Sequence, residues 1–429
     1  MHDDVTQRRS VADHAAAVAE AVAPALAAAR GRAAARVDVA TLLTQVGAGA
    51  GLSPRVLARD AVAVVALPGF DNSQMDGYAV RAADLATATA QAPVALPVVA
   101  PVPAGTQPPP LEAGTAAPVM TGAPVPAGAD AVVRIEDADP PRFPDPATSA
   151  AVRFVAPAVA GTFVRAAGSD VAAGDVLVPA GTPLGAPQLG ALVAAGVTTV
   201  EVAAPPHVLL VSTGSELAPA GAALGPAQVH DANGAALTAA LGQAGARVTT
   251  RVAPDHPDAL LRVLADAPGD VALVVTTGGV SAGAYEVVRQ TLADAWFGHV
   301  AVQPGGPQGL GTVAVGGGRR VPLVAFPGNP VSAYVSFELF LRPLLAAATG
   351  ASPAHRAAGR APLAEPLDSP PTLHQVRRGT IDAHGRVRMT GGPGSHLLTH
   401  LAAASVLVHV PSGVAHLDAG DPVDYQELR

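Results

Sequence analysis

The sequence predicts a multidomain α/β protein whose central domain has a mostly parallel sheet. The length of 429 residues corresponds to about three domains. Buried strand-like runs alternate with helical runs from Pro205 onward, and the regions before and after lack that alternation. With 49% hydrophobic and 14% charged residues, the composition is that of a folded chain. We therefore expect one α/β domain accompanied by others.

The N-terminal part begins with a helical pattern and then changes to β texture. Val11–Arg30 carries apolar residues at helical spacing, and we expect Pro24 to kink this helix or split it in two. From Ala61 onward, short Val-rich runs are cut by Pro and Gly, which is typical of small antiparallel strands and bulged loops. This region is predicted to be mainly β.

The region from Pro205 to Gly350 predicts a βαβ succession. The expected strands are 208–211, 247–252, 272–275 and 323–326, and the expected helices lie near 235–245, 257–265, 285–295 and 331–348. After Gly350, a Pro-rich segment and short strands such as 386–389 and 405–410 predict a small C-terminal β module.

Composition excludes several classes of protein. There is no Cys, so disulfides, thiolate nucleophiles and protein-held iron–sulfur clusters are excluded. All 26 basic residues are Arg, and the net charge of −8 does not suit a protein that coats a duplex, so we expect no nucleic-acid partner. The first ten residues lack an apolar signal region, and no run has about 18 strongly apolar residues. We therefore expect a cytoplasmic protein without a membrane partner.

Acidic side chains follow the predicted strands, where open parallel sheets bind their ligands. Glu216, Asp255 and Glu286 come from three separate loops at the carboxyl edge of the sheet. Mg²⁺ prefers one or two carboxylates together with water and phosphate oxygens, so this rim suits Mg²⁺. The alternative is that Asp231 and Asp255 cap helices and that Glu216 is a solvated loop charge.

Two loops of this edge have the composition of ligand-binding turns. Gly278 and Gly279, followed by Ser281, stand before a helix and predict an anion-binding nest, although an ordinary tight turn explains the two glycines equally well. The second loop is a stiff turn that opens the next helix, and its candidate residues are Pro327, Gly328, Asn329, Pro330 and Ser332.

The β region contains two further motifs. Phe70–Ala79 is dense in Asp, Asn, Ser and Gly, and Val119–Asp130 is a loop braced by Gly and Pro that would hold Thr121 in a fixed pose. Local turn chemistry is an alternative explanation for both.

These motifs identify the sequence as a member of the molybdopterin molybdenumtransferase (MoeA) family, which is similar to the E domain of gephyrin. The resemblance spans nearly the whole chain. It rests on motifs in the family's order: FDNSQMDGYAV (70–80), MTGAPVPAGADAVV (120–133), GSD with GD (168–175), STGSEL (212–217), TTGGVSAG (276–283), PGNPVSA (327–333) and GSH (394–396).

The resemblance implies the last step of molybdenum cofactor synthesis. Molybdate is inserted into adenylylated molybdopterin with Mg²⁺-dependent release of AMP, and the substrates are those two molecules. It also implies a homodimer, with the active cleft between the α/β domain of one subunit and the second domain of the other. The implied functional positions are Asp76, Thr121, Asp170, Glu216, Asp255, Glu286, Pro327 and Pro330.

The resemblance also implies the domain arrangement. An elongated N-terminal part would comprise 1–60 and 168–204, a mainly β domain 61–167, a MogA-like molybdopterin-binding α/β domain 205–350, and a small β-barrel-like domain 351–429.

One departure from the family concerns the oxyanion. Relatives often carry Lys where this chain has His299, Gln303 and Gly306. Charged hydrogen bonds contribute about 1.5–3 kcal/mol each, so other groups must replace them. Positions that match the family's oxyanion contacts are Ser332, Arg378 and Ser395, with His299 and Arg377 as possible helpers.

Two other functions are compatible with part of the sequence. A dimeric scaffold paralogue could keep the fold without catalysis, and a molybdopterin adenylyltransferase would share the α/β domain. The adenylyltransferase needs neither Phe70–Val80 nor the C-terminal module. Retention of every rim carboxylate favours the transferase over the scaffold.

Overall fold

The chain forms two compact units, each containing helices and strands. The computed structural model describes residues 8–32, 34–47, 55–103, 105–143, 151–280, 286–292, 294–351 and 356–428. Unit 1 consists of Met1–Arg59, Ala180–Gly185 and Glu201–Arg429, and unit 2 consists of Asp60–Pro179 and Ala186–Val200. The protein is therefore a multidomain mixed α/β protein.

The centre of unit 1 is a six-stranded sheet with the order β16-β13-β17-β21-β20-β18. The first four strands are parallel, β20 pairs antiparallel with β21, and β18 pairs antiparallel with β20. The predicted mostly parallel sheet is thus present. Its strands are β13 (His207–Thr213), β16 (Arg247–Ala253), β17 (Val271–Thr277), β18 (Trp296–His299), β20 (Pro307–Val315) and β21 (Arg319–Phe326).

The sequence did not predict the two antiparallel strands. The reason is that β20 contains Gly309 and Gly311, and glycine is uncommon inside strands. A methyl group at Gly309 would lie 2.5 Å from a ring carbon of Phe297, and one at Gly311 would lie 2.7 Å from Ala295 Cβ. Close packing of the neighbouring segment therefore explains both glycines.

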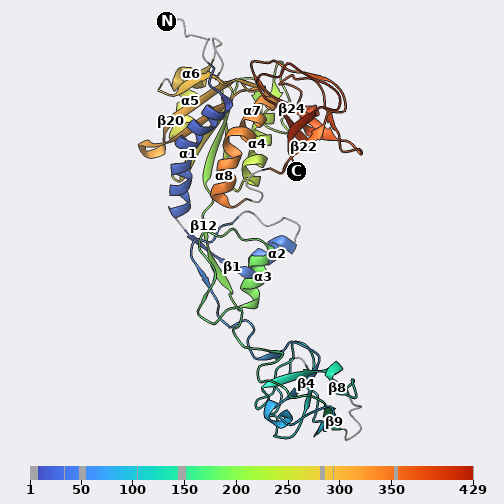
Figure 1. Ribbon diagram of the computed structural model, residues 1–429. Coiled ribbons are helices and arrows are strands. Elements are labelled where there is room, and N and C mark those ends of the chain that lie inside the picture. Colours follow the sequence, from blue (N-terminus) through green and yellow to red (C-terminus); the bar gives the residue numbers. More distant parts are fainter. Residues whose placement is uncertain are drawn as a thin grey trace. The chain divides into compact units, whose positions relative to one another are not determined.

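Helices cover both faces of this sheet (Figure 1). On one face lie α1, α4 and the continuous helical segment that begins at Pro330, and on the other lie α5 and α6. The bounds are α1 (Val11–Arg32), α4 (Ala232–Gln243), α5 (Pro257–Ala265), α6 (Val287–Thr291), α7 (Pro330–Ser336), the π-helix η4 (Phe337–Leu341) and α8 (Arg342–Thr349).

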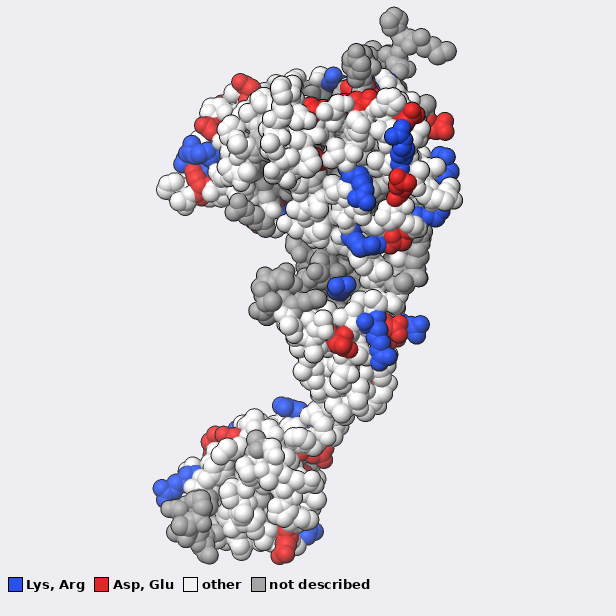
Figure 2. All heavy atoms as spheres, turned by 180° about the vertical axis from the view of Figure 1, so that it is seen from behind, with Lys and Arg blue, Asp and Glu red and all other residues white. Residues whose placement is uncertain are grey.

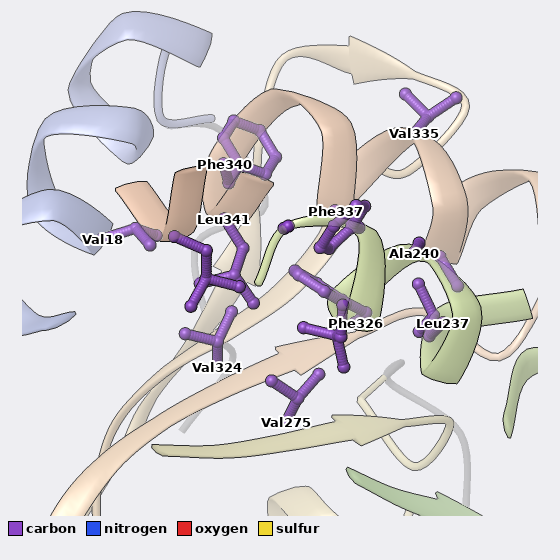
Figure 3. Close-up of a cluster of buried hydrophobic side chains, with 14 of the residues drawn as sticks. Val18, Leu237, Ala240, Val275, Val324, Phe326, Val335, Phe337, Phe340 and Leu341 are labelled. Carbon is purple, nitrogen blue, oxygen red and sulfur yellow. The ribbon is translucent and has the colours of Figure 1, made fainter. Parts of the chain in front are cut away.

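The core explains why the central strands read as continuous apolar runs. Every residue of β13 and β17 is buried, because both faces are covered. Figure 3 shows how side chains from four elements meet on one face: Val18 of α1, Leu237 of α4, Val275 of β17 and Phe326 of β21. This packing fixes the direction in which the carboxyl ends of the strands, and the loops after them, are presented.

Two helical stretches of unit 1 are long and apolar enough to cross a membrane by length and composition, namely Val11–Ala29 and Pro330–Thr349. Both contribute buried side chains to the cluster over the sheet. The first contains Pro24 within one helix, so the expected split is wrong. The second ends at Gly350, whose φ of 70° is left-handed, and a side chain there would meet Val56 and Pro183.

The C-terminal part of unit 1 is a second sheet with the order β19-β24-β26-β28-β22, and β25 pairs with β24. Val302–Gln303 contributes its first strand from within the preceding α/β region. The barrel-like description of this part stays a prediction. Its elements are β19 (Val302–Gln303), β22 (Ala358–Pro362), β23 (Leu367–Asp368), β24 (His374–Ile381), β25 (Val387–Met389), α9 (Leu398–Ala403), β26 (Val406–Val410), β27 (His416–Leu417) and β28 (Pro422–Glu427).

The remaining elements of unit 1 are short. They are β1 (Ala34–Asp38), α2 (Val39–Gly47), β14 (Leu217–Ala218), β15 (Val229–His230) and η3 (Gly316–Gly318). Strand β12 (Thr199–Ala203) begins in unit 2 and ends in unit 1.

Unit 2 is built mainly from strands of two to four residues, arranged in small sheets around two apolar clusters. In the sheet β6-β4-β7, the middle strand is Gly77–Val80, all of whose residues are buried. The elements are β2 (Ala61–Val62), β3 (Asn72–Ser73), β4 (Gly77–Val80), η1 (Ala82–Leu85), β5 (Val94–Pro97), β6 (Ala117–Val119), β7 (Ala131–Arg134), η2 (Ile135–Asp137), β8 (Ala138–Asp139), β9 (Ala151–Phe154), β10 (Val164–Arg165), β11 (Val176–Val178) and α3 (Ala186–Ala194).

The charged side chains on the face shown in Figure 2 are spread as small groups among uncharged surface, and Arg and acidic atoms often adjoin. Pairs such as Arg59–Glu201 at 3.0 Å and Arg153–Asp139 at 2.6 Å are solvent-exposed. Exposed pairs of this kind contribute about 0–1 kcal/mol. Stability therefore comes from the apolar clusters.

Candidate functional site

The carboxyl ends of three neighbouring strands meet at one edge of the unit 1 sheet. Ser212 of β13 is aligned with Thr277 of β17, and Thr277 is aligned with Phe326 of β21. The loops that follow these residues are the ones in which the sequence placed most of its candidates. In an open α/β sheet this is the edge where ligands bind.

Buried hydroxyl groups at this edge lack protein partners. Ser212 Oγ, Thr276 Oγ1 and Thr277 Oγ1 accept or donate no hydrogen bond within the described part of the chain. All three side chains are less than 2% exposed. Buried polar groups are usually hydrogen-bonded, so such a group needs an explanation, and a bound ligand is one.

The turn after β17 requires both of its glycines. Gly278 and Gly279 have φ values of 85° and 66°, in the left-handed region. A methyl group at Gly278 would lie 2.8 Å from the Thr213 carbonyl oxygen. Close packing against the protein therefore explains both glycines, and the Gly278 N–H donates to the Phe326 carbonyl at 3.1 Å. Ser281 and Tyr285 lie outside the described residues, so the rest of the nest prediction is untested.

The loops that carry Glu216 and Asp255 are joined by hydrogen bonds between Ser215, the residue before Glu216, and Asp255. Ser215 donates its backbone N–H to Asp255 Oδ2 at 2.9 Å, and the Asp255 N–H donates to Ser215 Oγ at 3.1 Å. The Glu216 carboxylate folds over Gly214, since a methyl group there would lie 2.6 Å from Glu216 Oε2. Neither loop therefore moves independently of the other.

The helix-capping alternative holds for one residue and not for the other. Asp231 caps α4 by accepting from the Gly234 N–H at 2.8 Å. Asp255 does not cap α5, because His256 is the capping residue. The carboxylate of Asp255 thus has a role at the loop rather than at the helix.

The third predicted metal ligand, Glu286, comes from a different loop. It precedes α6, and its side chain makes no capping hydrogen bond. Across the described ranges, no three His, Cys, Asp or Glu side chains are grouped as metal ligands. Mg²⁺ needs only one or two carboxylates when water and phosphate oxygens complete its shell, so the assignment of Glu216, Asp255 and Glu286 stays a prediction.

A cavity of about 400 Å³ lies beside this edge and is formed by three loops. Its lining includes Pro327, Gly328, Asn329 and Ser332 of the stiff turn, as predicted, together with Ser395. Pro330 is the first residue of α7 and does not belong to the lining. The whole lining comprises residues 302–307, 327–329, 332, 373 and 393–395.

Hydrogen bonds hold the loops of this cavity in place. Asn233 of α4 donates its Nδ2 to the Gly328 carbonyl at 2.6 Å, and the Val331 N–H donates to the Ser395 carbonyl at 3.1 Å. Sequence reasoning missed Asn233. Its position two residues after the capping Asp231, in the first turn of a helix that follows a strand, is the signal that could have found it.

The two neighbouring arginines of β24 support the third loop. Arg378 donates to the Gly392 carbonyl, and Arg377 donates to the Gly391 carbonyl at 2.9 Å. Arg378 is 1% exposed, and its Nε and Nη1 have no partner within the described ranges. Burial lowers the pKa of Arg378, and the charge of Arg377 lowers it further. Arg378 therefore supports the loop that carries Ser395 through this hydrogen bond, and it does not line the cavity.

The remaining residues of the oxyanion prediction lie on the first loop. Gln303 and Gly306 line the cavity, and Gln303 Oε1 accepts from Gln375 Nε2 at 2.6 Å. His299 is exposed, and its ring lies 3.7 Å from where a methyl group on Gly306 would be. Sequence reasoning did not find Gln375, because only the pairing of β19 with β24 brings it beside Gln303.

The two candidates of unit 2 contact each other directly. Asp76 Oδ1 accepts from the Thr121 N–H at 2.6 Å and from its hydroxyl at 2.9 Å. These bonds lower the pKa of Asp76, the backbone bond most. Both residues are exposed, so the carboxylate is fixed in place yet open to solvent. Asp170, also exposed, is placed by its N–H, which donates to the Leu67 carbonyl at 2.9 Å.

Part of the Phe70–Ala79 motif serves local structure. Asp71 accepts from the Ala167 N–H at 2.7 Å, and Ser73 donates to the Met75 carbonyl at 2.6 Å. Gly77 has no room for a side chain, because its Cβ would collide with the Val133 carbonyl. Turn chemistry and close packing thus explain these residues, whereas the Asp76 carboxylate contacts the separate loop of Thr121.

Three models of protein families match the chain in succession. These are the MoeA N-terminal region (domains I and II) at residues 9–196, a probable molybdopterin-binding domain at 209–347, and the MoeA C-terminal region (domain IV) at 360–428. The fold and the candidate site therefore define the class as a MoeA-type multidomain protein.

Relatives of nearly the same length agree. The chain is 42% identical over 385 residues to "Molybdopterin molybdenumtransferase 2" of Mycobacterium tuberculosis, and 34% identical over 383 residues to "Molybdopterin molybdenumtransferase" of Synechococcus elongatus. Each match covers 87% of this chain and 92% of the relative. A solved structure, the molybdopterin biosynthesis MoeA protein of Pyrococcus horikoshii, has a TM-score of 0.76 at 28% identity and covers 99% of this chain and 100% of that one. The chain belongs to the molybdopterin molybdenumtransferase family.

Proposed function

We propose that this protein is a molybdopterin molybdenumtransferase that inserts molybdate into adenylylated molybdopterin and releases AMP in a Mg²⁺-dependent step. The observation that carries the proposal is the cavity of about 400 Å³, in which the predicted turn Pro327–Ser332 meets Ser395 beside the ligand-binding edge of the sheet. The names of the family's relatives supply the substrate class.

The edge of the sheet provides what the nucleotide part of the substrate requires. The substrate carries phosphoanhydride charge, and the buried hydroxyl groups of Ser212 and Thr277, which have no partner among the described residues, can donate hydrogen bonds to it. Glu216 and Asp255 would hold Mg²⁺ on the phosphate side. When bound, Mg²⁺ supplies neutralisation of the negative charge that grows as AMP departs.

The cavity provides what the oxyanion requires. Ser332, Ser395 and Gln303 line it and can donate hydrogen bonds to oxygen atoms. The charge of Arg378 lies behind the loop of Ser395, to which it is tied through Gly392. In this arrangement, neutral hydrogen-bond donors line the cavity in place of the lysines that relatives often carry. The guanidinium of Arg378 supports one of the loops.

The test is a complete reaction with purified protein. Given adenylylated molybdopterin, Mg²⁺ and molybdate, the protein should release AMP and yield cofactor that activates an apo-molybdoenzyme. Omission of molybdate or chelation of Mg²⁺ is the matched control, and both should reduce activation of the apo-enzyme. AMP release no higher than the blank would contradict the proposal and favour the scaffold. Consumption of ATP with unmodified molybdopterin would favour an adenylyltransferase.

We further propose that the protein is a cytoplasmic homodimer, as the family resemblance implies. Light scattering coupled to size-exclusion chromatography would check the dimer, and a mass equal to 42.2 kDa would contradict it. The four-part domain division 1–60 with 168–204, 61–167, 205–350 and 351–429 is likewise a proposal, which limited proteolysis would test.

A further inference from the structure

A pair of glutamine side chains stands where the first loop meets the C-terminal sheet. Gln303 and Gln375 are opposite each other in the parallel pairing of β19 with β24. Gln375 is 2% exposed, and its Nε2 donates to Gln303 Oε1 at 2.6 Å. Gln303 is half-buried and lines the cavity. The buried glutamine thus holds the side chain of the cavity-lining one.

This contact determines which end of the Gln303 carboxamide faces the cavity. Because Oε1 of Gln303 is engaged by Gln375, its Nε2 is the end of the carboxamide that remains to face an acceptor in the cavity. If both amides were reversed, Gln375 would bury an unpartnered NH₂ group instead of the unpartnered Oε1 that it has. Orphaned buried N–H groups are rarer than under-satisfied carbonyl oxygens, so the donor orientation is favoured.

We propose that Gln303 is a specificity-determining hydrogen-bond donor to the oxyanion, and that Gln375 is the positioning residue that keeps its Nε2 turned into the cavity. This inference rests on the proposed function, since it deepens the account of the same cavity.

The lining of the cavity is uncharged, which predicts how binding depends on salt. No charged side chain belongs to the lining, and its side-chain donors are Gln303, Asn329, Ser332 and Ser395. Neutral donors recognise a tetrahedral oxyanion by the directions of their N–H and O–H bonds rather than by charge. Binding should therefore weaken only slightly as salt rises, because screening acts mainly on exposed charges.

Equilibrium dialysis of molybdate against the full chain, with molybdenum quantified on both sides, tests the inference without requiring turnover. We expect Gln303→Met to weaken molybdate binding about 5- to 10-fold, as loss of one hydrogen bond implies. Gln375→Met should weaken it about 3-fold, since the amide is kept but no longer held. Gln243→Met, at the exposed end of α4, is the matched control and should bind like the unchanged protein.

The double variant separates positioning from a general structural effect. If Gln375 acts through Gln303, Gln303→Met with Gln375→Met should bind molybdate no more weakly than Gln303→Met alone. Additive losses would overturn the positioning role. Gln375→Glu gives a second arm, because a carboxylate only accepts and would turn the Gln303 oxygen into the cavity. Its binding should fall below that of Gln375→Met, with thermal melting used to confirm that each variant is folded.

The outcomes also separate this inference from the proposed function. Molybdate binding that is unchanged in Gln303→Met, in a protein that releases AMP, would overturn the inference and leave the function standing. Absence of molybdate binding and of AMP release in the unchanged protein would overturn both.

Discussion

The two ends of the same central strands treat their polar groups in opposite ways. At the amino end, His207 of β13 contacts Asp270 at 2.7 Å through Nδ1 and Thr249 at 2.8 Å through Nε2, and Arg247 pairs with the same Asp270. At the carboxyl end, the buried hydroxyls of Ser212 and Thr277 have no partner within the described ranges.

This difference separates a structural network from a binding edge. The strands between the two ends have the same apolar, fully buried character, so burial alone does not distinguish the ends. At the amino end the protein satisfies its own polar groups, which stabilises the fold. At the carboxyl end, Thr213 Oγ1 donates to the Thr277 carbonyl at 3.1 Å, but the Ser212 and Thr277 hydroxyls have no partner within the described ranges, which costs stability unless a ligand provides one.

The largest expected effect is on turnover, from substitutions at the carboxyl edge of the sheet. Glu216→Ala or Asp255→Ala should lower turnover by roughly 10²- to 10³-fold, the loss expected when one group that stabilises transition-state charge is removed. The melting temperature should change little, because Glu216 is exposed and Asp255 keeps its backbone bond to Ser215. Steady-state AMP release and a thermal melt would be measured on each variant. Equal losses of stability and turnover would instead support a purely structural role for these carboxylates.

The fold was largely predictable from the sequence where burial is two-sided. Val208–Val211 and Ala272–Val275 are parts of β13 and β17, and Pro257–Ala265 matches α5. The antiparallel strand β20 was missed because its glycines are set by contacts with Phe297 and Ala295, which no local pattern shows. Pro24 does not break α1, whose buried residues Val18, Val22 and Leu26 pack on the sheet.

The site was predictable only where single loops carry it. The turn Pro327–Ser332 is local in sequence, and four of its six residues line the cavity. Gln375 and Asn233 were not predictable, because each acts on a loop more than 70 residues away in the chain. The sequence assigned Arg378 to the oxyanion, which stays a prediction, and it did not show that Arg378 donates a hydrogen bond to the Gly392 carbonyl.

At the amino end of the strands, a substitution should lower stability and leave turnover unchanged. Asp270→Ala removes the carboxylate that pairs with both His207 and Arg247, and loss of a hydrogen bond to a charged group costs about 1.5–3 kcal/mol. Arg247 Nη2 remains within hydrogen-bond distance of His207 Nδ1, at 2.9 Å. Turnover at saturating substrate should be unchanged, because this end lies opposite the candidate site along the strands. Urea unfolding and AMP release would be compared with those of the unchanged protein. A large loss of activity in folded Asp270→Ala would break the distinction between the two ends.

His14 shows that an unfilled buried group is not always a binding group. Its ring is 0% exposed between Trp296 and Phe340, and its Nε2 has no partner in the described part of the chain. Burial, helped by the charge of Arg9, lowers the pKa of His14 from 6.5 to about 4. No cavity among those found includes it.

The pH dependence of stability follows from that shift. The folded pKa lies below the unfolded one, so the unfolded state binds the proton first as pH falls below 6.5, and stability is lost until pH reaches about 4. Between pH 7 and pH 5 the loss from His14 should be about 2 kcal/mol. His14→Phe should remove this part of the dependence, measured by urea unfolding followed through Trp296, the single tryptophan. Identical pH profiles for the two proteins would show that His14 is not the titrating group.

The smallest expected effect comes from replacing one threonine by valine at each end of the central strands, which compares the two ends directly. Thr277→Val removes a buried hydroxyl that has no partner among the described residues, so stability should stay within about 0.5 kcal/mol or rise slightly. Thr249→Val removes the partner of His207 Nε2 and should cost about 1 kcal/mol. Turnover should respond the other way, with a fall of a few-fold in Thr277→Val and no change in Thr249→Val. Equal stability losses at the two ends would mean that Thr277 has a partner of its own in the folded protein, and the carboxyl end would then be as closed as the amino end.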